Sequence, residues 1–209
     1  YKNVEYDFRY YKNLKMYVHA EKVRELDNPQ TGELTLFMRI GSDFTSNYYE
    51  YEMPLHYTPW GTSVNDNQII WPSENEIILD LDQLVEIKES RNRKIRSGST
   101  EYSNSQIYSE YLDDKRISVL GTPNLGKVKV IMIGIRNPRK RDVNDGDDME
   151  PKSAMVWINE LRLTDFNNKG GWAATALART NLADLGNVSF HGAYSSSGFG
   201  SIEQQISNL

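Results

Sequence analysis

Apolar and polar residues alternate along much of this chain, and the alternation changes its character near the double glycine Gly170-Gly171. A period of two is typical of a β-strand whose two faces meet different surroundings. Before the glycines, residues 154–166 read AMVWINELRLTDF, which predicts the closing strand of a compact β-domain. After them, the apolar residues of 172–195 are small, alternating and flanked by aromatics. The pattern predicts two different kinds of sheet in one chain.

The part of the chain before the glycines reads as a series of antiparallel strands. Three runs, 14–21, 34–40 and 48–55, each place apolar side chains on one face and mixed side chains on the other. The run 128–135 is apolar at nearly every position, so we expect it to be buried on both faces at the centre of the core. With six or more strands before Thr164, the chain is mainly β. The pattern predicts an antiparallel, jelly-roll-like β-sandwich with long loops.

One short helix and one irregular insert interrupt these strands. Asp80 is a candidate N-cap for the helix, and helical spacing follows it at Leu81, Leu84, Val85 and Lys88. From 89 to 116 the apolar content falls and polar residues dominate, which predicts a flexible insert. We therefore expect one sandwich domain over residues 1–168 and a separate β-hairpin within 172–209.

The predicted hairpin consists of two alternating runs joined by turn-forming residues. If a five-residue loop over 183–187 joins the runs, the apolar faces of both fall on the same side. The partners in that register are Leu182 with Val188, Thr180 with Phe190, and Ala176 with Tyr194.

Each run is about ten residues long, which is the length that a tilted β-strand needs to cross a bilayer. In that setting Val188, Phe190 and Tyr194 are predicted to face lipid, and Arg179 and Asn181 to face the lumen of a barrel. The alternative is an ordinary amphipathic hairpin packed on a soluble core. Periodicity alone leaves both interpretations open.

Several specific sequence segments favour the membrane interpretation. The segments VWINELRLTDFNNKGGWAA (156–174), LADLGNVSF (182–190) and SSGFGSIEQ (196–204) resemble the SprA/Sov family of giant bacterial cell-surface proteins. The resemblance extends to IGSDFTSNYYEYEMPL (40–55), WPSENEI (71–77) and VIMIGIRNP (130–138).

This resemblance implies a fragment of a very large outer-membrane β-barrel that exports folded cargo in type IX secretion and gliding motility. Residues 1–168 would then be an extramembrane domain, outside the cytoplasm and at the cell surface in preference to the periplasm. Residues 172–209 would be a hairpin of the barrel. The implied partners are secreted cargo proteins, other outer-membrane secretion subunits and the membrane itself. Without its barrel neighbours, the fragment is expected to self-associate through 172–209.

A rival hypothesis comes from the strand 156–163, which also resembles the final strand of jelly-roll carbohydrate-binding modules. Such modules stack aromatic side chains on sugar rings. The candidate side chains here are Trp60, Trp71, Tyr48, Tyr57 and Trp157.

Composition and motifs point away from catalysis. The formal net charge of −5 argues against nucleic-acid binding, and the absence of cysteine excludes thiolate chemistry. The histidines His19, His56 and His191 lie in separate segments, with His19 on the wet face of its strand. The acidic loop 142–148 fails the spacing of an EF-hand, so we expect a solvated turn there. The expectation is a non-enzymatic protein without a cofactor.

Overall fold

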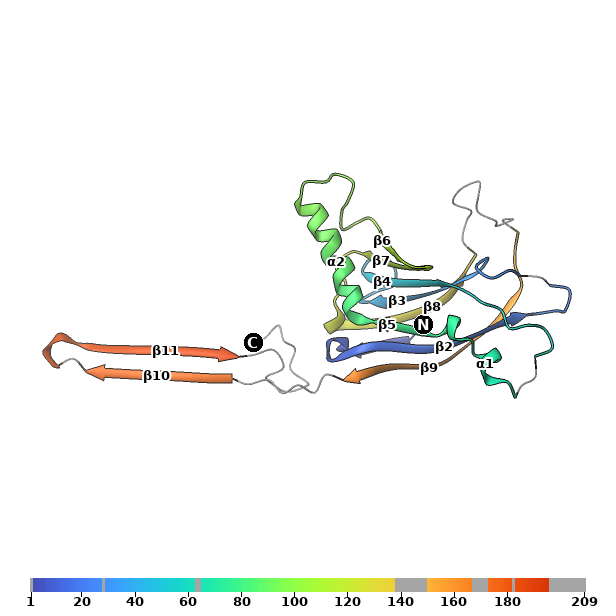
Figure 1. Cartoon of the computed structure of the whole chain (residues 1–209). Coiled ribbons are helices and arrows are strands. Elements are labelled where there is room, and N and C mark those ends of the chain that lie inside the picture. Colours follow the sequence, from blue (N-terminus) through green and yellow to red (C-terminus); the bar gives the residue numbers. More distant parts are fainter. Residues whose placement is uncertain are drawn as a thin grey trace. The chain divides into compact units, whose positions relative to one another are not determined.

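The computed structural model describes residues 2–27, 29–62, 65–137, 150–166, 173–181 and 183–195. The chain divides into two units, Tyr1–Phe166 and Asn167–Leu209, which are described separately below (Figure 1). Both are built of antiparallel β-structure.

The described residues of the first unit form two sheets (Figure 1). The larger sheet has six strands in the order β1-β8-β3-β4-β7-β6, and the smaller has three in the order β5-β2-β9. The bounds are β1 Lys2–Tyr6, β2 Tyr11–Lys22, β3 Thr35–Gly41, β4 Tyr48–Pro54, β5 Ile77–Asp80, β6 Tyr108–Leu112, β7 Lys115–Leu120, β8 Val128–Arg136 and β9 Ala154–Phe166.

β1 and β2 follow one another along the chain, joined by the 3-10 turn Phe8–Tyr10, yet they belong to different sheets. β1 pairs with β8 in the larger sheet, and β2 pairs with β5 and β9 in the smaller one. The chain therefore passes from the larger sheet to the smaller one between Tyr6 and Tyr11.

The core lies between the two sheets. Alternate residues of β2 point into it, including Leu14, Met16 and Val18, and so do Leu36 and Met38 of β3. Each of these side chains is at most 1% exposed. Because the inner faces of two sheets share this one cluster, the predicted antiparallel sandwich is confirmed.

The helix after β5 is longer than its sequence suggests. α2 (Leu81–Arg96) begins where predicted, with the Asp80 side chain accepting a hydrogen bond from the backbone N–H of Asp82 at 3.0 Å. Its buried stripe continues through Ile87 to Arg91. A shorter helix, α1 (Asn67–Ile70), precedes β5.

The prediction of a flexible insert over 89–116 is therefore wrong for much of its length. α2 occupies its first part, and β6 and the start of β7 occupy its last part. A few side chains of this segment are buried, such as Arg91 and Tyr108 at 0% and 5% exposure, although Ile107, Tyr111 and Leu112 remain exposed. A sparse apolar pattern thus suffices, because neighbouring elements supply the rest of the burial.

The strand buried on both faces is β4, and the prediction that 128–135 fills this role is wrong. Every residue from Tyr48 to Met53 is buried, whereas Lys129 and Ile135 of β8 are exposed. β4 lies inside the larger sheet, between β3 and β7.

Ion pairs cover the outer face of β4. The side chains of Glu50 and Glu52 are each only 5% exposed, because three guanidinium groups surround their carboxylates. Arg39 Nε lies 2.7 Å from Glu50 Oε2, and Arg136 Nη1 lies 2.5 Å from Glu52 Oε2. Arg116 also pairs with Glu52. These five residues are called the arginine–glutamate cluster below.

The second unit contains a hairpin of β10 (Ala173–Asn181) and β11 (Asn187–Ser195), joined through a 3-10 turn at Ala183–Leu185. Thr180 pairs with Val188 and Ala178 with Phe190, so the predicted pairing is wrong by two residues along β11. Asn187 already pairs with Asn181 and belongs to the strand, not to the loop. Leu182 lies outside the described residues.

The shift of two residues keeps the predicted faces, since side chains alternate with a period of two. Val188, Phe190 and Tyr194 share one face of the hairpin, opposite Thr180, Ala178 and Ala174. Arg179 and Asn181 lie at register positions of the other face.

We predict that Glu52→Gln lowers the free energy of unfolding at pH 7 by about 3 kcal/mol, because it leaves Arg116 and Arg136 short of a carboxylate. Burial alone would raise the pKa of Glu52, but the Thr35 hydrogen bond and the two arginine charges outweigh it and lower the pKa. The stabilisation is present above the unfolded pKa near 4.5 and is lost as the pH falls through the folded pKa.

Urea unfolding at pH 7 and at acidic pH measures both effects. The variant should lose part of the acid sensitivity of the parent chain. Glu101→Gln, at an exposed position, is the control and should change stability by less than about 0.5 kcal/mol. Equal stability of the Glu52 variant and this control at pH 7 would contradict the role of the cluster.

Candidate functional site: a tryptophan-lined groove

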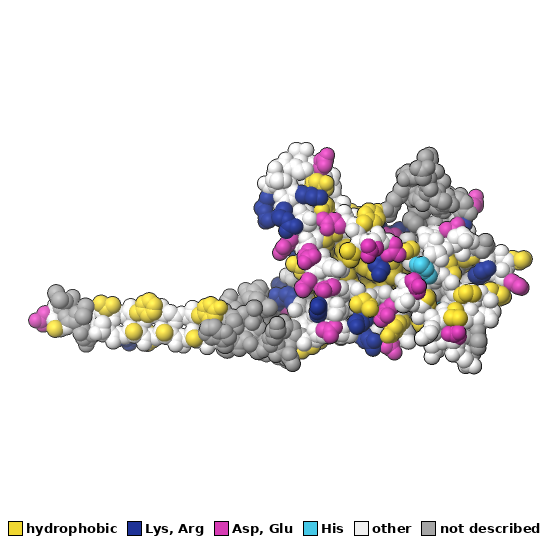
Figure 2. All heavy atoms as spheres, viewed as in Figure 1, with side chains coloured by type: hydrophobic (Ala, Val, Ile, Leu, Met, Phe, Trp, Pro, Cys, Tyr) yellow, Lys and Arg dark blue, Asp and Glu magenta, His cyan; other side chains and the backbone are white. Residues whose placement is uncertain are grey.

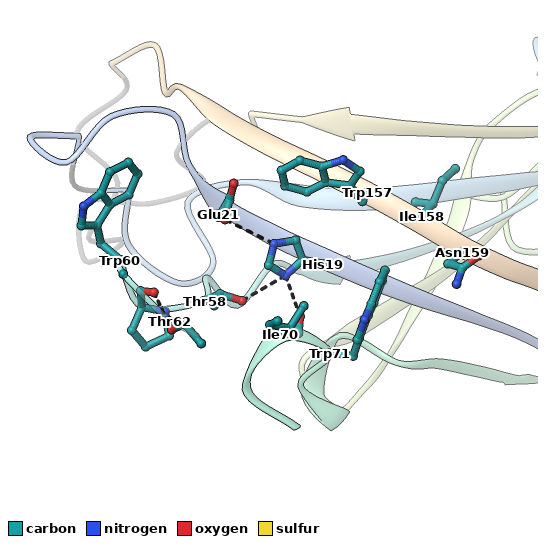
Figure 3. A pocket seen from close by; sticks show the side chains of 12 residues that line it. His19, Glu21, Thr58, Trp60, Thr62, Ile70, Trp71, Trp157, Ile158 and Asn159 are labelled. Carbon is teal, nitrogen blue, oxygen red and sulfur yellow. Dashed lines mark hydrogen bonds and ion pairs between the residues drawn. The ribbon is translucent and has the colours of Figure 1, made fainter. Parts of the chain in front are cut away.

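A groove of about 710 Å³ opens on the first unit beside the outer face of the smaller sheet (Figure 3). Strands β2 and β9, the loop that follows β4, and the residues at the end of α1 form its walls. Its lining residues are His19, Glu21, Thr58, Pro59, Trp60, Gly61, Thr62, Ile70, Trp71, Trp157, Ile158 and Asn159.

Strand alternation supplies the floor of the groove. Val18 and Ala20 of β2 point into the core, so His19 and Glu21 point outward. β9 pairs with β2 so that Trp157 lies opposite His19.

Two short connections supply the opposite wall. The backbone N–H of Thr58 donates to the carbonyl of Ala20 at 2.8 Å, which ties the loop after β4 to β2. The Asp66 side chain caps α1, and Trp71 follows as its C-cap residue. Trp71 thereby reaches the outer face of β2 next to Tyr17, with ring centroids 6.4 Å apart.

His19 has polar and aromatic contacts on several sides. Its Nδ1 lies 2.6 Å from the Ile70 carbonyl oxygen and 3.1 Å from Thr58 Oγ1, and its Nε2 lies 3.5 Å from a Glu21 carboxylate oxygen (Figure 3). Trp157 and Trp71 flank the ring at centroid distances of 5.0 and 5.8 Å. The residue is only 7% exposed, so the expectation that His19 is wetted by solvent is wrong: the indoles cover it.

Thr58, His19 and Glu21 lie next to one another, as the nucleophile, base and acid of a catalytic triad do. The Ile70 carbonyl can only accept a hydrogen bond, so His19 Nδ1 carries the proton. That nitrogen is the one nearest to Thr58, and it therefore cannot accept the threonine proton. Thr58 Oγ1 instead donates to the Ile69 carbonyl at 3.2 Å. The three residues hold the wall of the groove together and do not form a catalytic relay.

Indole surface remains open to solvent in the groove. Trp60 is 50% exposed and Trp157 is 44% exposed, while Trp71 is partly buried. Large exposed aromatic side chains in a concave, partly polar site are typical of binding sites.

The structure brings together three of the five aromatic residues proposed as sugar-binding candidates, namely Trp60, Trp71 and Trp157. The other two lie elsewhere. Tyr48 is buried under the guanidinium group of Arg39, whose Cζ lies 4.2 Å from the ring centroid. Tyr57 packs against the core, and burial raises its pKa to about 12.

Sequence reasoning missed the polar residues of the groove. Glu21, Thr58 and Asn159 come from three segments that only the β2–β9 pairing and the loop after β4 unite. The sequence offers one sign that Glu21 and Asn159 belong to the site. Each lies two residues along a strand from an outward-pointing side chain, His19 or Trp157, and therefore on the same face.

Other candidate sites remain apart. Among the described residues, no group of three histidine, aspartate or glutamate side chains is placed to hold a metal ion. The acidic loop 142–148 lies outside the described residues. The backbone N–H of His56 donates to Asn75 Oδ1, and His191 lies opposite Leu177 in the hairpin. None of the helices in the described part of the chain has the length and apolar character needed to cross a membrane.

The described residues thus form an antiparallel β-sandwich with an aromatic groove and a separate two-stranded hairpin unit. The family model SprA_N, described as "Motility related/secretion protein", matches residues 1–208, so the chain belongs to this family. Membership confirms the family resemblance seen in the sequence and indicates an association with the cell envelope. A comparison with curated proteins found no match.

We predict that Thr58→Val lowers the free energy of unfolding by about 1–2 kcal/mol, since it removes the hydroxyl that contacts His19 and the Ile69 carbonyl. Tryptophan emission should shift to longer wavelength in the folded state, because Trp71 and Trp157 lose their fixed packing on His19. Thermal unfolding and fluorescence spectra measure the two effects. Thr122→Val, at an exposed position, is the control and should change neither; an unchanged Thr58 variant would show that the wall does not depend on this hydroxyl.

Proposed function

We propose that this chain is a non-catalytic structural segment of a giant outer-membrane β-barrel that exports folded proteins in type IX secretion and gliding motility. The first unit is an extracytoplasmic domain, at the cell surface in preference to the periplasm. The hairpin of the second unit is part of the barrel wall. Membership in a motility and secretion family supports the general role.

The observation that carries the proposal is the chemistry of the two hairpin faces. One face pairs alanines of β10 with Tyr194, Phe190 and Gly192 of β11, and Thr180 with Val188. It offers small and aromatic apolar groups without a charge, which suits contact with lipid. The other face includes Arg179 opposite Ser189, which suits a water-filled lumen.

The dimensions and exposure of the hairpin agree with this role. Each strand has nine residues, within the range for a tilted membrane-spanning strand. Phe190 is 64% exposed and Tyr194 is 58% exposed, and hydrophobic side chains are in view along the hairpin (Figure 2). An isolated two-stranded sheet is marginal in water, so neighbouring barrel strands and lipid are needed to cover these side chains. Without them, residues 172–209 mediate self-association of the isolated chain.

The partners of this role are proteins and lipid. Secreted cargo passes through the complete barrel, and other outer-membrane secretion subunits contact the extracytoplasmic domain. Acidic and basic side chains are mixed on the viewed face of the first unit, without the basic stripe that nucleic-acid binding requires (Figure 2).

We predict that Phe190→Lys in the full-length protein impairs barrel assembly, because a lysine on the lipid face costs about 2–4 kcal/mol near the bilayer midplane. Ser189→Lys is the matched control, since Ser189 is the adjacent residue on the opposite face, paired with Arg179. Outer-membrane fractionation and protease resistance measure assembly. Loss of assembly is expected for Phe190→Lys and near-normal assembly for Ser189→Lys; the reverse ranking would refute the proposed facing.

A further inference from the structure

We propose that the tryptophan-lined groove is a binding site for the uncharged sugar rings of a neutral oligosaccharide or polysaccharide. This inference goes beyond the proposed function, because a barrel segment needs no ligand site on its extracytoplasmic domain. The observation that supports it is that three indole side chains and several polar side chains line the same groove.

The exposed indoles match the apolar face of a sugar ring. A pyranose presents C–H groups on its faces and hydroxyl groups around its edge. The face of an indole carries partial negative charge and attracts the weakly positive C–H groups, while the flat contact excludes water. Trp157 and Trp60, at 44% and 50% exposure, offer two such platforms at separate positions of the groove (Figure 3).

The polar groups near the indoles match the hydroxyl edge. Glu21 from β2 and Asn159 from β9 line the same groove as Trp157, and Thr62 lines it near Trp60. The Glu21 side chain is 34% exposed, so its carboxylate can accept hydrogen bonds from a ligand. A few placed polar groups beside aromatic surface fix the orientation of a small ligand.

The walls of the groove are held in place before any ligand binds. His19 is fixed by the Ile70 carbonyl and by Thr58, and it supports both Trp157 and Trp71. A preformed site avoids the entropy cost of ordering large side chains upon binding.

Charge narrows the ligand class to neutral sugars. Among the described lining residues, Glu21 is the single carboxylate, and lysine and arginine are absent. Because no lysine or arginine in that lining offsets its charge, the Glu21 carboxylate repels uronic acids, sulfated sugars and phosphate groups. Neutral rings avoid this repulsion and can donate hydroxyl hydrogens to the same oxygen atoms.

A proline-rich peptide is the main competing ligand for aromatic grooves. Such peptides insert prolines into slots between aromatic rings. Here the imidazole of His19 lies near both Trp71 and Trp157, at 5.8 and 5.0 Å, and it occupies the space where such a slot would form. Flat stacking on the outer indole surfaces remains, which favours a sugar ring over a proline.

The test uses the 209-residue chain and calorimetric titration with four probes: chitotriose, cellotriose, trigalacturonic acid and a decaproline peptide. We expect binding of at least one neutral trisaccharide, with at least tenfold weaker binding of the acidic trisaccharide. Trp157→Ala and Trp60→Ala should each weaken binding at least tenfold. Tyr111→Ala, which removes a 60% exposed aromatic on β6 outside the groove, is the control and should bind normally.

Glu21→Gln tests the assignment of charge without removing the indoles. It should reduce the preference for neutral over acidic trisaccharide at least threefold. Circular dichroism and thermal unfolding of each variant ensure that lost binding is not lost folding. Binding of decaproline in preference to both neutral sugars, or failure of both neutral sugars to bind the folded parent chain, would overturn the proposal, as would neutral-sugar binding that survives in both tryptophan variants.

Discussion

The antiparallel pairing of β2 with β9 is the interaction on which the first unit depends. β9 has thirteen residues and β2 has twelve, and their pairing closes the smaller sheet over the core. It also contains a register shift between Lys15 and Tyr17, where β9 has one extra residue. Glu160 sits in this bulge with a φ of 54°, in the left-handed region. Without the extra residue, Trp157 would point into the core and the groove would lose its central platform.

The bulge leaves a trace in the sequence. Val156 and Leu163 both pack against the core, although one has an even number and the other an odd number. A regular strand cannot place both on one face, so the run from 156 to 163 must contain a switch of parity. The alternation of apolar side chains along β2 and β3 predicted the sandwich correctly. The groove was harder to predict, because its residues come from four segments that only the folded chain unites.

The errors in the prediction share a physical cause. β4 carries Tyr48, Glu50 and Glu52 on its outer face, a pattern normally wetted by solvent. Three arginines, from β3, β7 and β8, cover these side chains, and the sequence of β4 alone does not reveal them. The segment 89–116 was misjudged in the same way, because α2 gains its burial from strands outside the helix, including the distant β2. In the hairpin, the register was wrong by two residues, yet the faces were right because only odd shifts exchange them.

The two units differ in what covers the strand face that points away from the core. This difference is the reason that the membrane proposal concerns the hairpin and the sugar-binding proposal concerns the sandwich. In the first unit, the chain supplies its own cover: guanidinium groups lie over Glu50 and Glu52, and indoles lie over His19. In the hairpin, the described residues include Leu177 on one face and Phe190 on the other, exposed by 61% and 64%. Burial of apolar surface is the main stabilising contribution to a sheet, so such a hairpin needs neighbours beyond its own two strands. The hairpin therefore carries the membrane proposal, whereas the self-covered sandwich can hold a rigid groove in water.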